Sequence, residues 1–367
     1  MSNLLLISSA LLTLFVLRTL VALVNAGSKP YLPDPKDQVS GKVSILIPAR
    51  NEEENLPRLL DSILRLNYQD VEVWVCDDHS SDSTAQVLEA WSAKDHRIRY
   101  FQGEPLPPSW TGKNYACHQL AKKATGDYLL FVDADVTLAS QVLQKALAFV
   151  QAKQLALLTI FPRQLMPGIS ERITVPFMNW ALLNLLPLVA VRKLKNPLFA
   201  AGNGQFMLFD TRLYKQTCWH KKVKSCYVED ILIVRALKKE GQRVAVLLGN
   251  NDVFCRMYQS YWESLQGFSR NVHEFFFGSR VLMVLFWISL LATPVALFLS
   301  WGWSGLLFYL VLFIINRLAV SWASREKLGA SLLLHPLHIV FFAHLIFSNA
   351  WLRIKKNGTW KERTIMG

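Results

Sequence analysis

The sequence predicts an α/β fold in which a mostly parallel, Rossmann-like sheet is flanked by transmembrane helices toward both ends of the chain. Short apolar runs alternate with helical patterns between residues 43 and 136, which is typical of βαβ units. The chain has 367 residues, is 52% hydrophobic and has a mean hydropathy of +0.23. So apolar a composition is unusual for a soluble protein and indicates membrane segments.

Residues 4–26 form the first apolar stretch, which is long enough to span a bilayer although Arg18 and Asn25 interrupt it. A cleaved signal peptide is the competing interpretation, because Val24, Asn25 and Ala26 resemble a cleavage site. The first three residues contain no Lys or Arg, and the apolar run is longer than that of most signal peptides. We therefore predict a retained N-terminal transmembrane anchor over residues 1–26.

Two further apolar stretches, residues 281–300 and 306–322, are joined by an uncharged turn. A third, residues 332–352, contains three histidines, a proline and an asparagine, which favours a re-entrant or interfacial segment over a full span. Residues 281–352 thus form the predicted C-terminal membrane region, and residues 353–367 form a basic tail.

The chain carries 40 Lys and Arg against 27 Asp and Glu. No motif typical of RNA- or DNA-binding proteins is present, and many basic residues flank the apolar stretches, so we expect anionic membrane lipids rather than nucleic acid as partners. By the positive-inside rule, the basic flanks place the middle of the chain in the cytoplasm. The prediction is a multi-pass protein of the cell membrane with a cytoplasmic catalytic domain; the oligomeric state is left open.

The five cysteines are odd in number and show no disulfide spacing, which indicates a reducing compartment. Cys218, His220 and Cys226 form a possible zinc-ligand set, but they lack a fourth ligand at motif spacing. We interpret them as ordinary structural residues.

Four strands are predicted in the middle of the chain, at residues 43–47, 71–76, 98–101 and 128–132. The fourth is a continuous apolar run, as expected of a strand that is covered on both faces. Helical patterns follow the first two strands, over residues 56–64 and 85–91.

Polar residues cluster just past the C-terminal ends of these strands. They are Arg50, Asp78, Asp133 and Asp135. In an open α/β sheet this edge binds ligands. Two carboxylates one residue apart suit Mg2+ or Mn2+, and an arginine suits phosphate. For a single cluster a helix cap or a solvated turn is an equally simple explanation, but the shared edge predicts a nucleotide and metal site.

Four segments resemble the family-2 glycosyltransferases, which have the GT-A fold. They read VSILIPARNEEENLPRLLDSIL, VEVWVCDDHSSDST, WTGKNYACHQLAKKATGDYLLFVDADV and CYVEDILIVRALKKEG, and they lie between residues 42 and 241. The resemblance implies that Pro48, Arg50 and Glu52 line the nucleotide entrance. It also implies that Asp78 holds the base or ribose and that Lys113 lies near the sugar-phosphate. Asp133 and Asp135 become the metal-binding D-x-D pair, with Asp135 preferred as the direct ligand.

An inverting sugar transfer needs one carboxylate to remove a proton from the acceptor hydroxyl. Asp230 lies at the start of a predicted helix over residues 231–239, where the helix dipole favours an ionised carboxylate, although such residues are also common helix caps. The family resemblance makes Asp230 the general base, with Glu229 and the Gly-rich turn at Gly204 bordering the acceptor.

Residues 173–191 are apolar and have basic residues on both sides. A full span there would separate Asp230 from Asp135. We therefore predict an interfacial helix within a domain of residues 27–280, with a buried core helix as the alternative.

A second, shorter resemblance concerns GFSRNVHEFFFGS, which is similar to bacterial carotenoid glycosyltransferases of the diaponeurosporenoate type and to hopene-associated relatives. It implies that Arg270 faces the departing diphosphate, although a juxtamembrane basic residue is an equally simple interpretation. The Trp of the Q-x-x-R-W motif of polymer-making relatives is absent after Arg270. We therefore expect an inverting transfer from a UDP-sugar donor to a membrane lipid or terpenoid acceptor. A processive polysaccharide synthase and a non-catalytic membrane scaffold are the alternatives.

Overall fold

The computed structural model describes all residues except 1, 36–37, 356–357, 361–362 and 366–367. The chain forms two compact units. The sheet unit comprises Pro30–Leu165 and Val189–Arg256, and the helical unit comprises Met1–Lys29, Met166–Leu188 and Met257–Gly367. Residues 166–188 and 257–280, which we predicted within the catalytic domain, therefore group with the terminal helices.

A seven-stranded sheet forms the centre of the sheet unit, in the order β3-β2-β1-β4-β8-β6-β9. All neighbouring strands are parallel except β8, which is antiparallel to both β4 and β6. The mostly parallel α/β sheet predicted from the sequence is confirmed. The strands are β1 (Val43–Ala49), β2 (Val71–Asp77), β3 (Ile98–Gln102), β4 (Tyr128–Val132), β6 (Leu157–Phe161), β8 (Phe206–Asp210) and β9 (Val244–Leu248).

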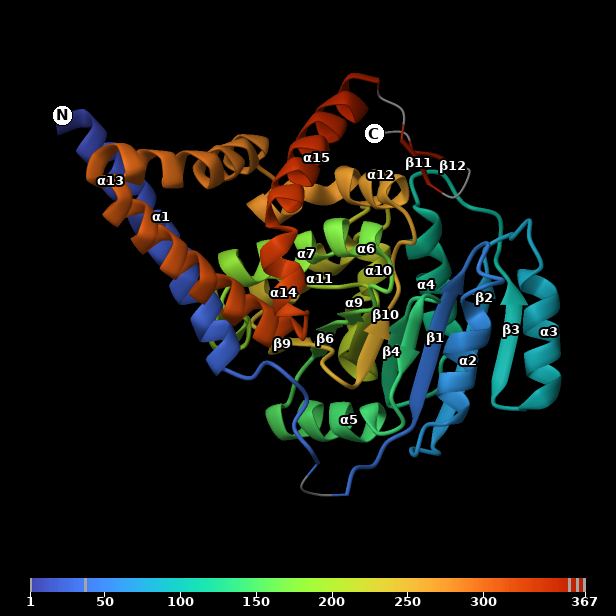
Figure 1. The fold of residues 1–367 in the computed structure, drawn as a ribbon. Helices are drawn as coiled ribbons and strands as arrows, with labels where there is room; N and C mark the ends of the chain where they lie inside the picture. The colour runs from blue at the N-terminus through green and yellow to red at the C-terminus, as the bar shows by residue number, and fades with distance from the viewer. Residues whose placement is uncertain (1, 36–37, 356–357, 361–362, 366–367) are drawn as a thin grey trace. The chain divides into compact units, whose positions relative to one another are not determined.

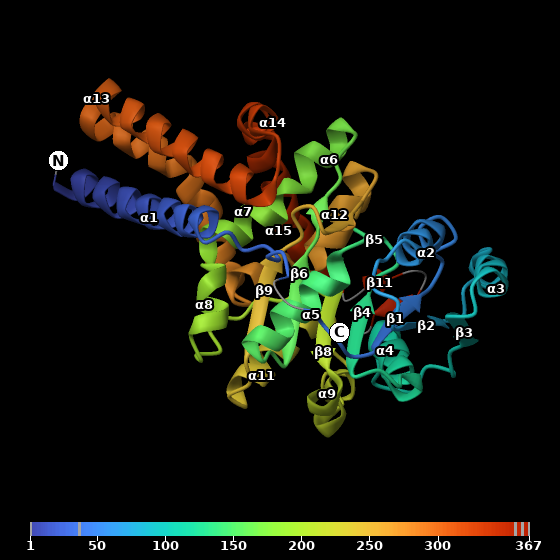
Figure 2. The same cartoon turned by 90° about the horizontal axis from the view of Figure 1, so that it is seen from below.

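Helices cover both faces of this sheet. Figure 2 shows α2 and α4 on opposite sides of β1, as right-handed crossovers in opposite directions require. A small second sheet has the order β5-β10-β7. The helices of the unit are α2 (Leu56–Leu64), α3 (Thr84–Lys94), α4 (Gly112–Lys123), α5 (Val142–Lys153), α9 (Thr211–Thr217), α10 (Trp219–Lys222) and α11 (Glu229–Lys239). The small strands are β5 (Val136–Leu138), β7 (Arg163–Gln164) and β10 (Val253–Cys255).

The helical unit contains two helices that are long and apolar enough to cross a membrane, Asn3–Gly27 and Arg280–Ser324. They are α1 (Ser2–Gly27) and α13 (Arg280–Ser324), which lie side by side (Figure 1) and expose many large apolar side chains. The backbone of α13 is broken at Gly302 (φ 62°, ψ −145°), so α13 is two helices joined at the predicted turn. The remaining elements are α6 (Ile169–Thr174), α7 (Pro176–Leu185), α12 (Tyr261–Asn271), η1 (Val272–Phe276), α14 (Leu328–Leu333), α15 (His335–Lys355), β11 (Gly358–Trp360) and β12 (Arg363–Ile365).

Asn25, one of the two polar interruptions of the first apolar stretch, is fully buried. Its amide nitrogen donates to the carbonyls of Leu183 (3.0 Å) and Leu186 (2.9 Å), and its oxygen accepts from the N–H of Leu188 (2.8 Å). These bonds satisfy backbone groups left free where α7 ends. Asn25 therefore fastens α1 to the end of α7.

The single helix predicted over residues 173–191 is not observed. The segment is divided among α6, α7 and α8 (Leu188–Lys193). Pro176 begins α7 and Pro187 stands between α7 and α8, and proline cannot donate the hydrogen bond that a continuous helix needs. Residues 332–352 are likewise divided between α14 and α15. The predicted basic tail includes β11 and β12, and its other residues beyond Lys355 lie outside the described part of the chain.

Candidate active site

The loops that follow β1 and β2 are tied together at one edge of the sheet. The Arg50 guanidinium donates from Nη1 to the carbonyls of Asp78 (2.6 Å) and His79 (3.2 Å). The N–H of Asp78 donates in turn to the carbonyl of Ala49 (2.8 Å), and the Asp78 side chain is buried. Arg50 thus positions the backbone that carries Asp78. Pro48 lies at the end of β1, opposite Cys76 of β2.

Lys113 connects two of the predicted acidic pairs. Its Nζ lies 2.8 Å from Oδ2 of Asp133, which follows β4, and 3.1 Å from Oε1 of Glu229, which begins α11. Burial by itself lowers the pKa of Lys113, but the charges of Asp133 and Glu229 raise this pKa well above its ordinary value. Lys113 is therefore a permanent cation between the D-x-D segment and the start of α11.

The loop before Lys113 is held by the segment that precedes Glu229. The N–H of Thr111 donates to the carbonyl of Lys224 (2.8 Å), and the side chain of Thr111 caps α4. Asn114, which is fully buried, donates from Nδ2 to the carbonyls of Val223 and Cys226, both at 2.9 Å. These bonds bring Lys113 next to Glu229 although the two residues are far apart in sequence.

Asp135 lies beside Gln205, a buried residue of the Gly-rich turn to which the sequence analysis assigned no role of its own. Gln205 Nε2 donates to Asp135 Oδ2 (3.1 Å) and to Cys255 Sγ (2.9 Å). Loss of hydration and the charge of Asp133 raise the pKa of Asp135 to about 7. The only sequence signal for Gln205 is a polar residue directly before a buried strand, and that signal is weak.

The oxygens around Asp135 suit a divalent cation. Asp135 Oδ1 and Gln205 Oε1 are both buried without a hydrogen-bond partner among the described residues, and the neighbouring Cys255 thiol is only a weak donor. Within the described residues no group of three or more His, Cys, Asp or Glu side chains is arranged to hold a metal. Mg2+ is commonly bound by one or two carboxylates together with substrate phosphates, and Asp133 and Asp135 fit that pattern.

Asp230 is held by two backbone N–H groups. Its Oδ2 accepts from Gly204 (3.1 Å) and its Oδ1 from Ile231 (2.8 Å). Its side chain is partly exposed, yet loss of hydration and the charge of Glu229 raise the pKa of Asp230 to about 7. A carboxylate with such a pKa is a suitable proton acceptor near neutral pH.

Two glycines allow this close packing. A Cβ atom on Gly204 would lie 2.7 Å from Lys113 Nζ and 3.0 Å from Glu229 Oε1. A Cβ atom on Gly202 would lie 2.8 Å from the backbone carbonyl of Asp230, which cannot move as a side chain can. Gly202, like Gln205, is a site residue that sequence reasoning did not single out.

We expect Gly202→Ala to lower the free energy of unfolding by about 1–3 kcal/mol, because the added methyl group overlaps the backbone at Asp230. The measurement is urea unfolding of the full chain, with Gly329→Ala as the control, since a Cβ atom on Gly329 meets nothing within 4 Å. Equal stability of Gly202→Ala and the unsubstituted chain would contradict the close approach.

The predicted residues of the sheet unit gather along one edge of the sheet. Lys113, Asp133, Glu229, Asp230 and Gly204 form one contact network, and Asp135 with Gln205 adjoins it. Glu52, which accepts a hydrogen bond from Asn55 (2.8 Å), lies close enough for its charge to act on Asp135. Arg270 belongs to α12 of the helical unit.

Comparisons with known proteins find similarity to glycosyltransferases in sequence and in fold. Residues 44–215 match the sequence model of glycosyl transferase family 2. The 4,4'-diaponeurosporenoate glycosyltransferase of Staphylococcus haemolyticus (strain JCSC1435) is 28% identical over 242 residues, which cover 64% of this chain and 62% of the relative. The protein of the same name from Staphylococcus aureus (strain USA300) is 27% identical over 343 residues, which cover 88% of this chain and 87% of the relative.

Among solved structures, mannosyltransferase PcManGT from Pyrobaculum calidifontis, in complex with GDP-Man and Mn2+, is similar with a TM-score of 0.56 and 16% identity. The similarity covers 95% of this chain and 99% of that one. At this level of identity the likeness concerns the fold.

Proposed function

We propose that the chain is an inverting glycosyltransferase with a UDP-sugar donor and a membrane lipid or terpenoid acceptor, because residues 44–215 match the model of glycosyl transferase family 2 and the sheet unit has the GT-A fold. The observation that carries this proposal is the network in which Lys113 joins Asp133 to Glu229 beside Asp230. It supports the proposal because the carboxylates proposed to hold the metal and the carboxylate proposed as proton acceptor lie at the same edge of the sheet.

The proposed reaction is a single displacement. Asp230 removes the proton of the acceptor hydroxyl, and the acceptor oxygen attacks the anomeric carbon from the face opposite the diphosphate. A new C–O bond forms at that carbon while its bond to the diphosphate breaks, so the configuration inverts. The two backbone N–H groups at Gly204 and Ile231 orient the Asp230 carboxylate for this step.

Asp133 and Asp135 are the residues that would hold Mg2+ or Mn2+. When bound, the cation offsets negative charge on the leaving diphosphate. Lys113 contributes a second positive charge next to Asp133. Pro48, Arg50, Glu52 and Asp78 border the proposed nucleotide site, and Arg270 is proposed to face the diphosphate.

The acceptor proposal rests on the relatives and on the helical unit. The two staphylococcal relatives are named for a carotenoid acceptor. The outward side chains of α1 and α13 are apolar and exposed, as expected of helices in a bilayer. We therefore propose a membrane protein with its sheet unit in the cytoplasm, where nucleotide sugars are available.

Mass spectrometry of lipid extracts tests this function. Cells that express the chain are expected to contain an apolar lipid or terpenoid whose mass is increased by one hexose or N-acetylhexosamine. Cells without the chain, and cells that carry Asp230→Asn, are expected to lack this product. Long polymer in a reaction with UDP-sugar would support a polysaccharide synthase instead, and no new product with any nucleotide sugar would support a scaffold.

We expect the transfer rate to rise with pH up to about 7 and to level off above it. The ionised form of Asp230 is the proton acceptor, and its pKa is raised to about 7, so below that pH the base is increasingly protonated. The measurement is kcat between pH 5 and 9 at saturating substrates, with UDP affinity at each pH to separate donor binding. A flat profile below pH 7 would contradict the assignment of Asp230.

Gln205→Leu is expected to weaken Mn2+ binding about 10- to 100-fold, because Gln205 orients Asp135 and leucine cannot donate to it. Electron paramagnetic resonance of free Mn2+ measures the affinity in the presence of UDP. Gln164→Leu is the matched control, since Gln164 is a buried glutamine that bonds to the carbonyl of Pro162 instead. Unchanged affinity in Gln205→Leu would remove Gln205 from the metal site.

A further inference from the structure

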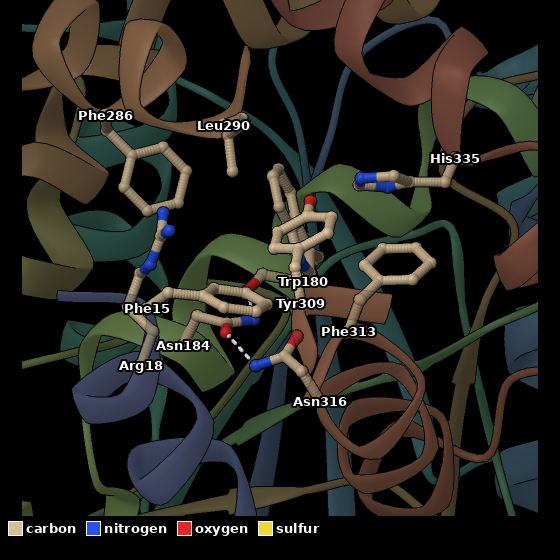
Figure 3. Close-up of a pocket in the computed structure, with 10 residues that line it drawn as sticks. All are labelled: Phe15, Arg18, Trp180, Asn184, Phe286, Leu290, Tyr309, Phe313, Asn316 and His335. Carbon is tan, nitrogen blue, oxygen red and sulfur yellow. Dashed lines mark hydrogen bonds between the residues drawn. The ribbon is translucent and has the colours of Figure 1, made fainter. Parts of the chain in front are cut away.

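A small cavity in the helical unit is lined by residues of α1, α7, α13 and α15 (Figure 3). Its volume is about 10 Å³, which is room for about one water molecule. Most of the lining side chains are aromatic, and the cavity is partly open rather than enclosed. The lining residues are Phe15, Arg18, Trp180, Asn184, Phe286, Leu290, Tyr309, Phe313, Asn316 and His335.

Arg18 is the charged residue of this cavity, and only 9% of it is exposed. Its guanidinium lies over the rings of Phe286 (4.8 Å) and Phe15 (5.3 Å), as Figure 3 shows. It donates one hydrogen bond, from Nη1 to Ser289 Oγ (3.3 Å). Its Nε–H is buried and has no hydrogen-bond partner in the part of the chain that the structure describes.

A second arginine, Arg317, packs against two of the aromatic residues that line the cavity and is 1% exposed. Its guanidinium lies over Trp180 (4.9 Å) and Phe313 (5.9 Å), both of which line the cavity. Its Nη2 contacts His335, whereas its Nε and Nη1 are buried and have no hydrogen-bond partner among the residues that the structure describes. Tyr309 lies within electrostatic range of both arginines.

The positive charge of this region is not balanced. Within the described residues, neither Arg18 nor Arg317 forms an ion pair with a carboxylate. Glu326 is near enough to interact electrostatically with Arg317, and it accepts a hydrogen bond from Asn179 (3.0 Å). Two buried cations therefore have one nearby acid. Buried charges are costly unless they are paired, so a further anion is expected.

We propose that this cavity binds the acidic head group of an amphiphile, with its apolar chain along the exposed apolar faces of α1 and α13. A guanidinium presents N–H groups that match the oxygens of a carboxylate or phosphate. The cavity has room for about one oxygen atom of a head group, and the rest of the head group and its chain would lie outside it. The site requires no nucleotide and no residue of the sheet unit, so it is independent of the proposed sugar transfer.

Binding by the purified full chain in neutral detergent tests the proposal. The probe is the fluorescent fatty acid cis-parinaric acid, with its uncharged methyl ester as the comparison. Arg18→Gln is expected to bind the acid at least tenfold more weakly than the unsubstituted chain and to bind the ester equally. Arg18→Lys keeps the positive charge but loses the planar guanidinium that can donate two parallel hydrogen bonds. We therefore expect its affinity for the acid to lie between those of the unsubstituted chain and Arg18→Gln. If Arg18→Gln does not fold, the affinity of Arg18→Lys tests the proposal. Native mass spectrometry with phosphatidylglycerol and with an unlabelled fatty acid distinguishes a phosphate head group from a carboxylate.

Arg325→Gln is the matched control, because Arg325 also lies over an aromatic ring, that of Trp322 (5.6 Å), but is exposed. It is expected to bind the acid as the unsubstituted chain does. Equal binding of acid and ester by the unsubstituted chain, or equal binding of the acid by Arg18→Gln, would overturn the proposal. Because no donor sugar is present, neither result bears on the transferase activity.

Discussion

Asp230→Asn is expected to lower the rate of sugar transfer by about 10²–10⁴-fold, the usual contribution of a general base. Asparagine has nearly the same shape as aspartate, but it does not accept a proton at neutral pH. UDP affinity is expected to stay within about twofold, because Asp230 contacts Gly204 and Ile231 rather than the proposed nucleotide residues. The measurements are kcat with saturating substrates and calorimetric UDP binding with Mn2+.

Asp210→Asn is the control for this variant. Asp210 also stands at a helix start, where it accepts from the N–H of Leu213 (2.9 Å), and asparagine caps helices about as well. We expect unchanged transfer in Asp210→Asn. Ordinary turnover in Asp230→Asn would exclude Asp230 as the base, and a lost UDP affinity would assign it to donor binding.

Lys113→Met is the substitution with the second large expected effect. We expect it to lower the transfer rate about 10²-fold and the free energy of unfolding by about 1–3 kcal/mol. The substitution leaves Asp133 and Glu229 without their shared cation. Because the charge of Lys113 also lowers the pKa of Asp230, its removal raises that pKa further. The rise of kcat with pH is therefore expected to move to higher pH.

Lys122→Met is the matched control, because Lys122 is exposed in the last turn of the same helix, α4. Transfer, stability and the pH profile are expected to be unchanged in it. A fall in the rate of Lys113→Met without a displaced pH profile would limit Lys113 to donor binding and separate it from Asp230.

Local sequence patterns were sufficient to predict much of the sheet. The bounds of β4 agree with the predicted strand, and β1, β2 and β3 extend the predicted runs by only one or two residues. Apolar runs of this length have few alternatives to a buried strand. The same logic placed Asp78, Asp133 and Asp135 at one edge, since the carboxyl ends of parallel strands meet there.

Contacts between distant segments were not predictable in this way. Gln205 and Gly202 carry only a weak sequence signal. Their roles depend on Asp135 and Asp230, which reach them only after β8 enters the sheet antiparallel to its neighbours. The sequence shows two prolines within residues 173–191, but the prediction of a single helix there did not allow for the helix ends that they cause.

The sequence by itself determined the strand pattern, the strand-end carboxylates and the apolar helices, because each depends on neighbouring residues and on a period of two or about four positions. Only the tertiary structure decided that Lys113 joins Asp133 to Glu229, and that Arg18 lies among aromatic rings without a carboxylate. Charge pairing acts between side chains that are far apart along the chain, and only folding determines which of them meet.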